Sequence, residues 1–463
     1  MVKIINETSF KKIKIVIIFL IAILTINTIN VVNADQTITN TTSGGLKTAI
    51  DNVDNGQTVY LENGVYSGKD NTNLTITKNI TIVGKGNNVV IDAKGISRIF
   101  TISHGVTVTL KNLKLINGKN THGGAINNEG TLFVSDCTFT NNKATEFGGG
   151  AISNNYNLSV SSSTFTNNQA IRHGGAIGSY YTFSVSGSTF TNNQAHYGGA
   201  IVCSMANDNT IVHLYVNAVS NCTFTDNKAT NYGGAIYNNY MNLFMTNSTF
   251  TNNQAKEGGA IYSNEYNISV NSCIFTNNQA TSGGAIHTIS SLSLTDCNFT
   301  NNQAKKDGGA IYVANMINNI IKDSILRIDS ANFKNNIAGS KYNAIYLESG
   351  AKISKNKVSI TPAEKTPLKA DLTINKITKK GNYRHVTIKN SGKISTGKKF
   401  YLGVYVGKKH IKRVLVKTLG VGKSTTVKVL IPKKYKNSLK TFKSDSTNRI
   451  PENNKKNNVR NAR

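Results

Sequence analysis

Acidic side chains are the first candidates for chemistry in this chain of 463 residues, because polysaccharide cleavage depends on carboxylates. A hydrolase needs two or three of them close together, and a lyase needs carboxylates that hold Ca²⁺ beside a basic residue. The motif Phe-x-x-Asn is repeated along the chain, and two of its copies have an aspartate three residues before the Phe. These aspartates are Asp136 and Asp296. They are six repeats apart, too far to act on one substrate. We expect solvated surface acids, no catalytic residues and therefore no enzyme.

Two histidines precede Gly-Gly pairs and raise the possibility of a metal site. His122 and His173 lie two repeats apart, which would separate them by about 10 Å if the repeats stack at strand spacing. No acid or cysteine accompanies them, whereas metal sites in proteins combine three or four ligands. Surface turn positions are therefore favoured, and we expect no metal and no other cofactor.

A column of aromatic residues could bind sugars. Tyr237, Tyr262, His287 and Tyr312 each follow the Ile of four consecutive Gly-Gly-Ala-Ile units. If the Ile points inward, these rings point outward, and exposed stacked rings can carry sugar rings. The alternative is a cross-strand stack that only stiffens a sheet, which we favour because earlier repeats have Asn, Ser or Gly at this position.

Two alternating motifs must position all of these side chains. Copies of Phe-x-x-Asn and Gly-Gly-Ala-Ile usually recur every 24–26 residues, a period that predicts a solenoid. Between the motifs, Leu158 and Val160 alternate with polar residues, which is typical of strands. The chain is thus expected to form an all-β parallel β-helix. The repeated Phe residues are Phe139, Phe165, Phe190, Phe224, Phe250, Phe275, Phe299 and Phe333.

Equivalent residues of stacked strands form ladders about 4.8 Å apart. We expect internal Phe and Ile ladders, and Gly-Gly corners where a Cβ would clash. The Asn of Phe-x-x-Asn is expected to tolerate left-handed turns and to form hydrogen-bonded amide stacks. Four of the five cysteines lie two residues before a Phe, where other repeats have Ser or Ala, so we expect buried thiols. Cys273 and Cys297 fall on consecutive turns, so a disulfide between them is the alternative to two free thiols.

The paired motifs over residues 123–350 resemble the repeat of chlamydial polymorphic outer-membrane proteins. They are also similar to those of adhesin-like surface proteins of methanogenic archaea, the type that we expect here. The resemblance implies a right-handed β-helix that is exposed at the cell surface and used for attachment.

Residues 35–122 contain no Gly-Gly-Ala-Ile but are expected to begin the same solenoid. Leu46, Ala49, Ile50 and Val53 would share one face of a helix that caps its open end. The strands and turns that follow are typical of pectate-lyase-like β-helices. That likeness supplies the alternative function, an extracellular polysaccharide lyase or hydrolase.

A second domain is predicted after a linker at residues 351–370, which contains two of the four prolines. Residues 371–463 show longer alternating strands, and Phe400, Leu402, Val404 and Val406 should face inward in an Ig-like β-sandwich. The domain resembles the CARDB adhesion-related domain, most specifically in its terminal segment 445–458. Lys455 replaces a second acid that is usual there, which implies weaker binding of any cation.

The N-terminal residues 1–34 are expected to be a secretory signal peptide. Basic residues precede an apolar run, Ile15–Ile26, and small or apolar residues then occupy the cleavage positions up to Ala34. An uncleaved signal anchor is the alternative, and it would be the only contact with a membrane. Either reading predicts a protein that is secreted or displayed at the cell surface.

The net charge of +30 is concentrated near the C-terminus, where residues 369–463 hold 26 lysines and arginines against three acids. Charge alone would admit nucleic acid as a partner, but export and the lack of a stacking-aromatic motif argue against it. An anionic cell-wall polymer fits better. We therefore expect an adhesin-like protein that attaches to cell-wall polymers, surface glycans or other cells.

Overall fold

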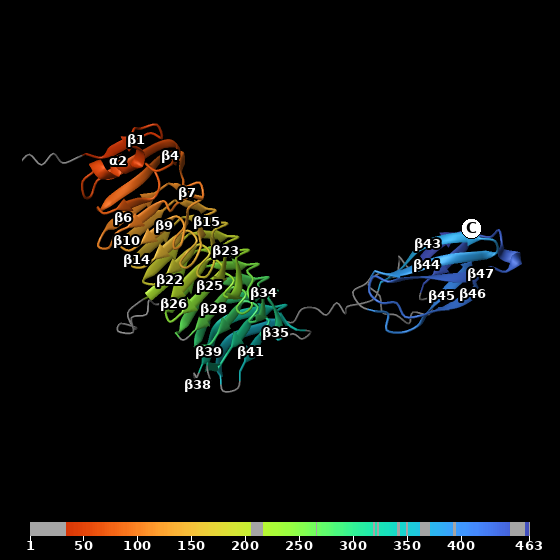
Figure 1. Cartoon of the computed structure of the whole chain (residues 1–463). Helices are drawn as coiled ribbons and strands as arrows, with labels where there is room; N and C mark the ends of the chain where they lie inside the picture. The colour runs from red at the N-terminus through yellow and green to blue at the C-terminus, as the bar shows by residue number, and fades with distance from the viewer. Residues whose placement is uncertain are drawn as a thin grey trace, which may run out of the picture. The chain divides into compact units, whose positions relative to one another are not determined.

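The computed structural model describes residues 34–204, 216–264, 266–317, 320–321, 324–339, 343–348, 351–361, 371–391, 395–444 and 459–462. These residues are almost all in strands, and the chain divides into two compact units between residues 363 and 364 (Figure 1). The predicted signal peptide, except its last residue, lies outside the described residues. Among the described residues, no helix is long and apolar enough to cross a membrane.

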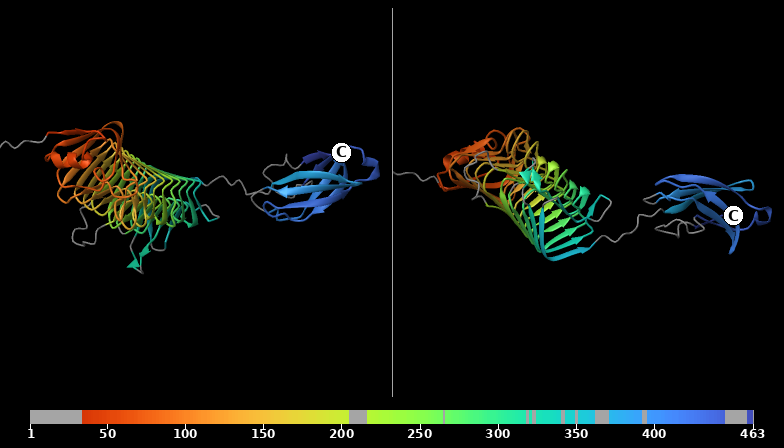
Figure 2. Two further views of the ribbon diagram at one scale, coloured as in Figure 1. Left: turned by 45° about the horizontal axis from the view of Figure 1, so that its top comes forward. Right: turned by 90° about the horizontal axis from the view of Figure 1, so that it is seen from below.

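The first unit is a parallel β-solenoid whose turns stack along one axis (Figure 2). Most turns contribute strands to three sheets, and equivalent strands of successive turns pair in parallel. Phe224, Phe250 and Phe275, for example, are direct partners on three adjacent strands. The repeat period therefore becomes the turn of the solenoid, as predicted.

Sheet 1 has 21 strands and sheet 2 has 11. The strands of sheet 1 are β1 (Gln36–Ile38), β2 (Thr58–Ser67), β4 (Ile80–Asp92), β6 (Thr107–Lys111), β7 (Lys114–Ile116), β10 (Thr131–Ser135), β11 (Thr138–Thr140), β14 (Asn157–Ser161), β15 (Thr164–Thr166), β18 (Phe183–Ser186), β19 (Thr189–Thr191), β22 (Val216–Ser220), β23 (Thr223–Thr225), β26 (Asn242–Thr246), β27 (Thr249–Thr251), β29 (Ile268–Asn271), β30 (Ile274–Thr276), β33 (Leu292–Thr295), β34 (Cys297–Thr300), β39 (Ile325–Lys334) and β42 (Lys352–Thr361). Those of sheet 2 are β3 (Leu74–Ile76), β5 (Phe100–Ile102), β9 (Ile126–Asn128), β13 (Ile152–Asn154), β17 (Ile177–Ser179), β21 (Ile201–Ser204), β25 (Ile236–Asn239), β28 (Ile261–Asn264), β32 (Ile286–Thr288), β36 (Ile311–Val313) and β41 (Ile345–Leu347).

Sheet 3 is made of shorter strands in two groups, which single-residue bridges at Gln254 connect. Its strands are β8 (Lys119–Asn120), β12 (Lys143–Ala144), β16 (Gln169–Ala170), β20 (Gln194–Tyr197), β24 (Lys228–Tyr232), β31 (Gln279–Ser282), β35 (Gln303–Asp307) and β40 (Ile337–Ala338). A small antiparallel hairpin, β37 (Met316–Ile317) and β38 (Ile320–Ile321), lies after β36 in the sequence.

The Phe ladder forms the predicted internal stack. Adjacent rings from Phe139 to Phe333 lie 4.7–4.8 Å apart between centroids and within 7° of parallel. The Ile of each Gly-Gly-Ala-Ile is buried on the sheet 2 side of the same core. The four cysteines that lie two residues before a Phe are buried free thiols, and Cys273 and Cys297 are not bonded to each other. At the N-terminal end, α2 (Gly45–Asn52) buries Leu46, Ala49 and Ile50 against the core, which confirms the predicted cap.

The sequence predicts both the left-handed turn and the amide stack at the Asn of Phe-x-x-Asn. In the structure, each residue of an Asn-Asn pair has one of these two roles. The first, such as Asn252, adopts a left-handed φ of 56° and is exposed. The second, such as Asn253, is fully buried and donates its amide to Asn278 of the next turn at 3.0 Å. The prediction of an amide ladder at the second Asn is confirmed, but the left-handed turn belongs to the residue before it.

The Gly-Gly corner is required by two different close approaches. The first glycine, such as Gly258, has a φ of 64°, and a Cβ there would lie 2.1 Å from the carbonyl oxygen of Ile261. A Cβ on the second, Gly259, would lie 2.0 Å from the carbonyl oxygen of Gly284 and 2.7 Å from the backbone nitrogen of Gln279. The corner thus packs directly behind sheet 3.

The solenoid extends further than the sequence indicated. Strand β42 pairs in parallel with β39 from Ile325 to Lys334, and Ile353 and Val358 pack against the core. The predicted linker at residues 351–370 is therefore wrong over its first half. The alternation of apolar and polar residues in β42 is hard to recognise in the sequence. This lysine-rich strand covers only one end of the core.

The second unit is an antiparallel β-sandwich. One sheet contains β43 (Leu372–Lys380), β44 (Tyr383–Asn390) and β47 (Ser424–Leu430). The other contains β45 (Phe400–Val406), β46 (Lys409–Val416), β48 (Lys440–Lys443) and β49 (Val459–Ala462), and the short η1 (Lys433–Tyr435) precedes β48. Phe400, Leu402 and Val404 are buried as predicted, whereas Val406 is half-buried. The terminal segment 445–458 lies outside the described residues.

Candidate functional site

The predicted aromatic column exists as a stack on sheet 2. Tyr237, Tyr262, His287 and Tyr312 lie on β25, β28, β32 and β36, and adjacent ring centroids are 5.6, 4.9 and 4.6 Å apart. Tyr346 on β41 continues the stack at 5.0 Å from Tyr312. The cross-strand stack that the sequence favoured is therefore present.

The expectation that these rings are exposed is wrong at the centre of the stack. Tyr262 is 5% exposed and His287 is 6% exposed, while Tyr237 and Tyr312 are half-buried. The residues before Gly-Gly cover them: the ring of Tyr232 lies 4.4 Å from that of Tyr262, and a Glu257 oxygen lies 3.8 Å from Nδ1 of His287. A covered stack offers little ring surface to a sugar.

Burial sets the electrostatics of this stack. It lowers the pKa of His287 to about 3 and is the main cause that raises the pKa values of Tyr237, Tyr262 and Tyr312. Burial also raises the pKa of Glu257, against an opposing effect of Lys256. At neutral pH the four rings are therefore uncharged, and they stabilise sheet 2.

The buried histidine predicts a pH-dependent stability. Below its usual pKa near 6.5, His287 takes up a proton in the unfolded chain but not in the folded one, so the stability that it contributes at pH 7 falls as the pH drops toward about 3. His287→Phe keeps a ring without a titrating group. We expect wild type to lose up to ~1.4 kcal/mol per pH unit relative to His287→Phe below pH 6.5.

Thermal unfolding between pH 7.5 and 5 measures this difference. His104→Phe is the control, because His104 is an exposed histidine of the same solenoid. The change in pH profile caused by His287→Phe should exceed the change caused by this control. Identical profiles for wild type and His287→Phe would show that the histidine is not held neutral by burial.

The two histidines considered as metal ligands are separated by an aromatic ring. Phe147 lies between them, with centroid distances of 5.8 Å to His122 and 6.2 Å to His173. Burial is the main cause that lowers the pKa of His173, with a contribution from Arg172. No group of three His, Cys, Asp or Glu residues that could hold a metal occurs in the described part of the chain.

The two aspartates considered for polysaccharide cleavage lie in turns. Asp136 and Asp296 have left-handed φ values of 55° and 51°, a conformation that Asn, Ser or Gly adopts at the same position of other turns. This column therefore serves the turn between two strands of sheet 1. The structure does not bring the two carboxylates together, since they remain six turns apart in the ladder.

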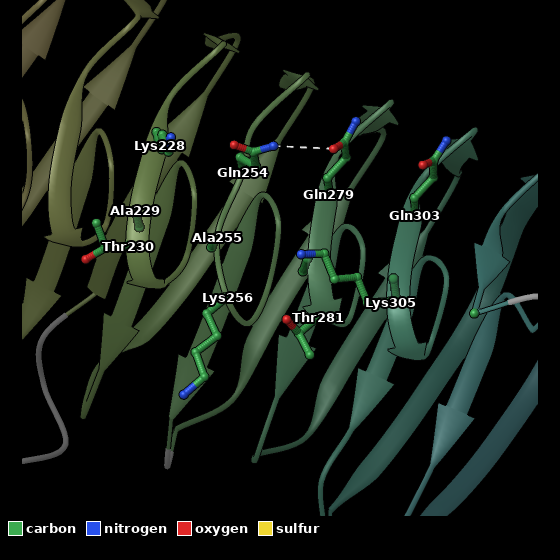
Figure 3. Close-up of a pocket in the computed structure, with 13 residues that line it drawn as sticks. Lys228, Ala229, Thr230, Gln254, Ala255, Lys256, Gln279, Thr281, Gln303 and Lys305 are labelled. Atoms are coloured by element: carbon green, nitrogen blue, oxygen red, sulfur yellow. Dashed lines mark hydrogen bonds between the residues drawn. The ribbon is translucent and has the colours of Figure 1, made fainter. Parts of the chain in front are cut away.

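A groove of ≈ 780 Å³ runs along the outer face of sheet 3, and the sequence analysis did not identify it. Figure 3 shows its two rows of side chains. Gln254, Gln279 and Gln303 form one row, and Lys256, Thr281 and Lys305 form the other. The backbone and the alanines between the rows make the floor.

Strand alternation explains this arrangement. In Gln279-Ala280-Thr281, the outer two side chains face solvent, and the central methyl turns inward and is buried. In-register pairing then places each Gln beside the next, and the Gln254 amide donates to Gln279 at 3.3 Å. The recurrent letters Asn-Asn-Gln-Ala are the sequence signal that could have indicated this row.

Family comparisons agree with this architecture. The model of the Chlamydia polymorphic membrane protein repeat matches seven segments, and the CARDB model matches residues 369–462. The seven segments are residues 136–155, 162–180, 187–204, 221–239, 247–264, 272–289 and 296–314. Each begins at the left-handed column before the Phe and ends at the last residue of a sheet 2 strand or one residue beyond it. No curated protein matches the chain.

The matched segments cover seven successive turns of the solenoid, and the CARDB match covers the β-sandwich. The chain therefore carries a β-solenoid of Chlamydia polymorphic membrane protein repeats followed by a C-terminal CARDB domain.

Proposed function

We propose that this adhesin-like protein is secreted or displayed at the cell surface and attaches to cell-wall polymers or surface glycans through the groove on sheet 3. The observation that supports it best is the repetition of the groove lining. Amide, hydroxyl and ammonium groups recur across consecutive turns and remain open to solvent. A polymer of repeated units can make the same kind of contact at each turn, and sugar hydroxyls both donate and accept hydrogen bonds with such groups.

The basic C-terminal domain supports attachment in a second way. Its described surface includes the exposed Lys409, Lys412 and Arg413 of β46. A field of one sign attracts an anionic surface over a Debye length of about 10 Å at 0.1 M salt. We propose that this domain provides a salt-sensitive contact with an anionic wall, and that the groove provides the selective contact.

Binding without cleavage is the test of this function. The purified full-length chain is applied to isolated cell walls and to a panel of polysaccharides, and bound protein and released sugar are both measured. We expect saturable binding and no new reducing ends or unsaturated products. Steady turnover would instead support the alternative function, a polysaccharide lyase or hydrolase.

A triple variant assigns the binding to the groove. Replacing Gln254, Gln279 and Gln303 by Ala removes three amides and should weaken glycan binding at least about tenfold, at roughly 0.5–1.5 kcal/mol for each hydrogen bond. The control replaces the exposed Thr223, Asn298 and Asn332 of sheet 1 by Ala. Equal losses in both triple variants would contradict binding in this groove.

A further inference from the structure

The lysines of the groove bear on which class of glycan it binds. Lys228, Lys256 and Lys305 line it, and among the 13 described residues that do so none is acidic. None of the three ammonium groups forms an ion pair with a described residue. The nearest acid in sequence, Glu257, is half-buried, with an oxygen 3.8 Å from His287 in sheet 2. Asp226 and Asp307 lie two residues from Lys228 and Lys305 in the sequence, but neither lines the groove, so its described lining is cationic.

The spacing of these cations follows the turns of the solenoid. Lys256 and Lys305 occupy the same ladder position with Thr281 between them, so their Cα atoms are two strand spacings, or about 10 Å, apart. Lys228 lies in the Gln row, one turn before Gln254 and on the opposite edge from Lys256. Positive charges thus line both edges, and neutral amide and hydroxyl groups lie between them.

We propose that the groove selects a linear acidic polysaccharide whose carboxylates recur along the chain. This inference rests on the proposed function and names the class of glycan. Ammonium groups on the edges would bind carboxylates, and the amide and hydroxyl groups between them would bind sugar hydroxyls. The described lining contains no aromatic side chain, whereas binding of single-stranded nucleic acid relies on base stacking as well as charge.

The experiment uses the full-length chain with the double variant Lys256→Gln and Lys305→Gln. The substitution keeps a long polar side chain and removes only the charge. The matched control, Lys111→Gln with Lys334→Gln, removes two exposed charges from β6 and β39 of sheet 1. Both variants keep the basic C-terminal domain, so its contribution is the same in each. Circular dichroism and thermal unfolding confirm equal folding.

The probes are polygalacturonate, hyaluronan, a sulfated dextran, neutral dextran and single-stranded DNA at about 0.1 M salt. We expect the groove variant to bind the two carboxylated polymers about tenfold or more weakly, since a hydrogen bond to a charged group is worth roughly twice a neutral one. Binding of any neutral glycan should change less than about twofold, as should the control's binding of every polymer. The loss should shrink at about 0.5 M salt.

The outcomes separate this inference from the proposed function. If the glutamine triple variant loses binding while Lys256→Gln with Lys305→Gln binds uronate polymers like wild type, the groove binds glycans without selecting acids, and this inference fails alone. An equal or larger loss of sulfated dextran or DNA binding in Lys256→Gln with Lys305→Gln would overturn the assignment to carboxylated polysaccharides. If no wall or glycan binds the wild-type chain, both proposals fail.

Discussion

Replacing Phe250 by alanine is expected to lower the free energy of unfolding of the solenoid by about 3–5 kcal/mol. The Phe250 ring is fully buried, and it lies 4.8 Å from the rings of Phe224 and Phe275, within 4° of parallel to each. Truncation removes both ring contacts. The walls of the resulting cavity belong to strands held in register on both sides, so little collapse can relieve it.

Phe244→Ala is a control from the same turn. Phe244 lies on β26 of sheet 1, but it is 47% exposed, so its truncation should change stability by less than about 1 kcal/mol. Denaturant unfolding compares the two variants. Hydrogen exchange locates the damage, which should be greatest in the turns next to Phe250, because each turn of a solenoid packs only on its neighbours. Uniform loss of protection along all turns would contradict serial coupling.

The Phe ladder shows why much of this fold could be predicted from the sequence. When one residue type recurs at the same place in each period, stacking the turns must place these residues beside one another, and burial follows for an aromatic ring. The same reasoning located the cap helix, because Leu46, Ala49 and Ile50 share one helical face. In these elements the local pattern and the long-range packing require the same residues.

The candidate site was harder to predict because its geometry depends on residues that change from turn to turn. Tyr232 and Glu257 cover the aromatic stack, yet the equivalent residue of the next turn is Ser282, so no motif marks this position. The Gln row recurs, but polar residues on a strand usually indicate only a solvated face. Its significance appears when in-register pairing places the glutamines and lysines along one groove.

The buried Asn ladder should be as sensitive as the Phe ladder, for a different reason. Asn253 Oδ1 accepts hydrogen bonds from the backbone and side-chain nitrogens of Asn227 at 3.1 and 3.0 Å. Its Nδ2 donates to the carbonyl oxygen of Phe224 and to Oδ1 of Asn278, both at 3.0 Å. One side chain therefore serves polar groups of the turn before it and of the turn after it, and all of these groups are buried.

Asn253→Ala removes these partners without supplying others. An unsatisfied buried polar group costs about 1–3 kcal/mol, and two donors of Asn227 lose their acceptor, so we expect a loss of at least ~3 kcal/mol in the free energy of unfolding. The neighbouring Asn252→Gly is the control. Asn252 is exposed and has a left-handed φ of 56°, which glycine adopts readily, so stability should change by less than about 1 kcal/mol.

Denaturant unfolding of the two asparagine variants decides between an amide network and a simple turn preference. If the left-handed turn alone explained why the chain repeats Asn-Asn, Asn252→Gly and Asn253→Ala would have similar small effects. A loss confined to Asn253→Ala, with exchange protection reduced on both sides of that turn, would show that the amides transmit stability along the solenoid. Equal stabilities of the two variants would mean that water replaces the missing amide, and the ladder would then contribute little to holding the turns in register.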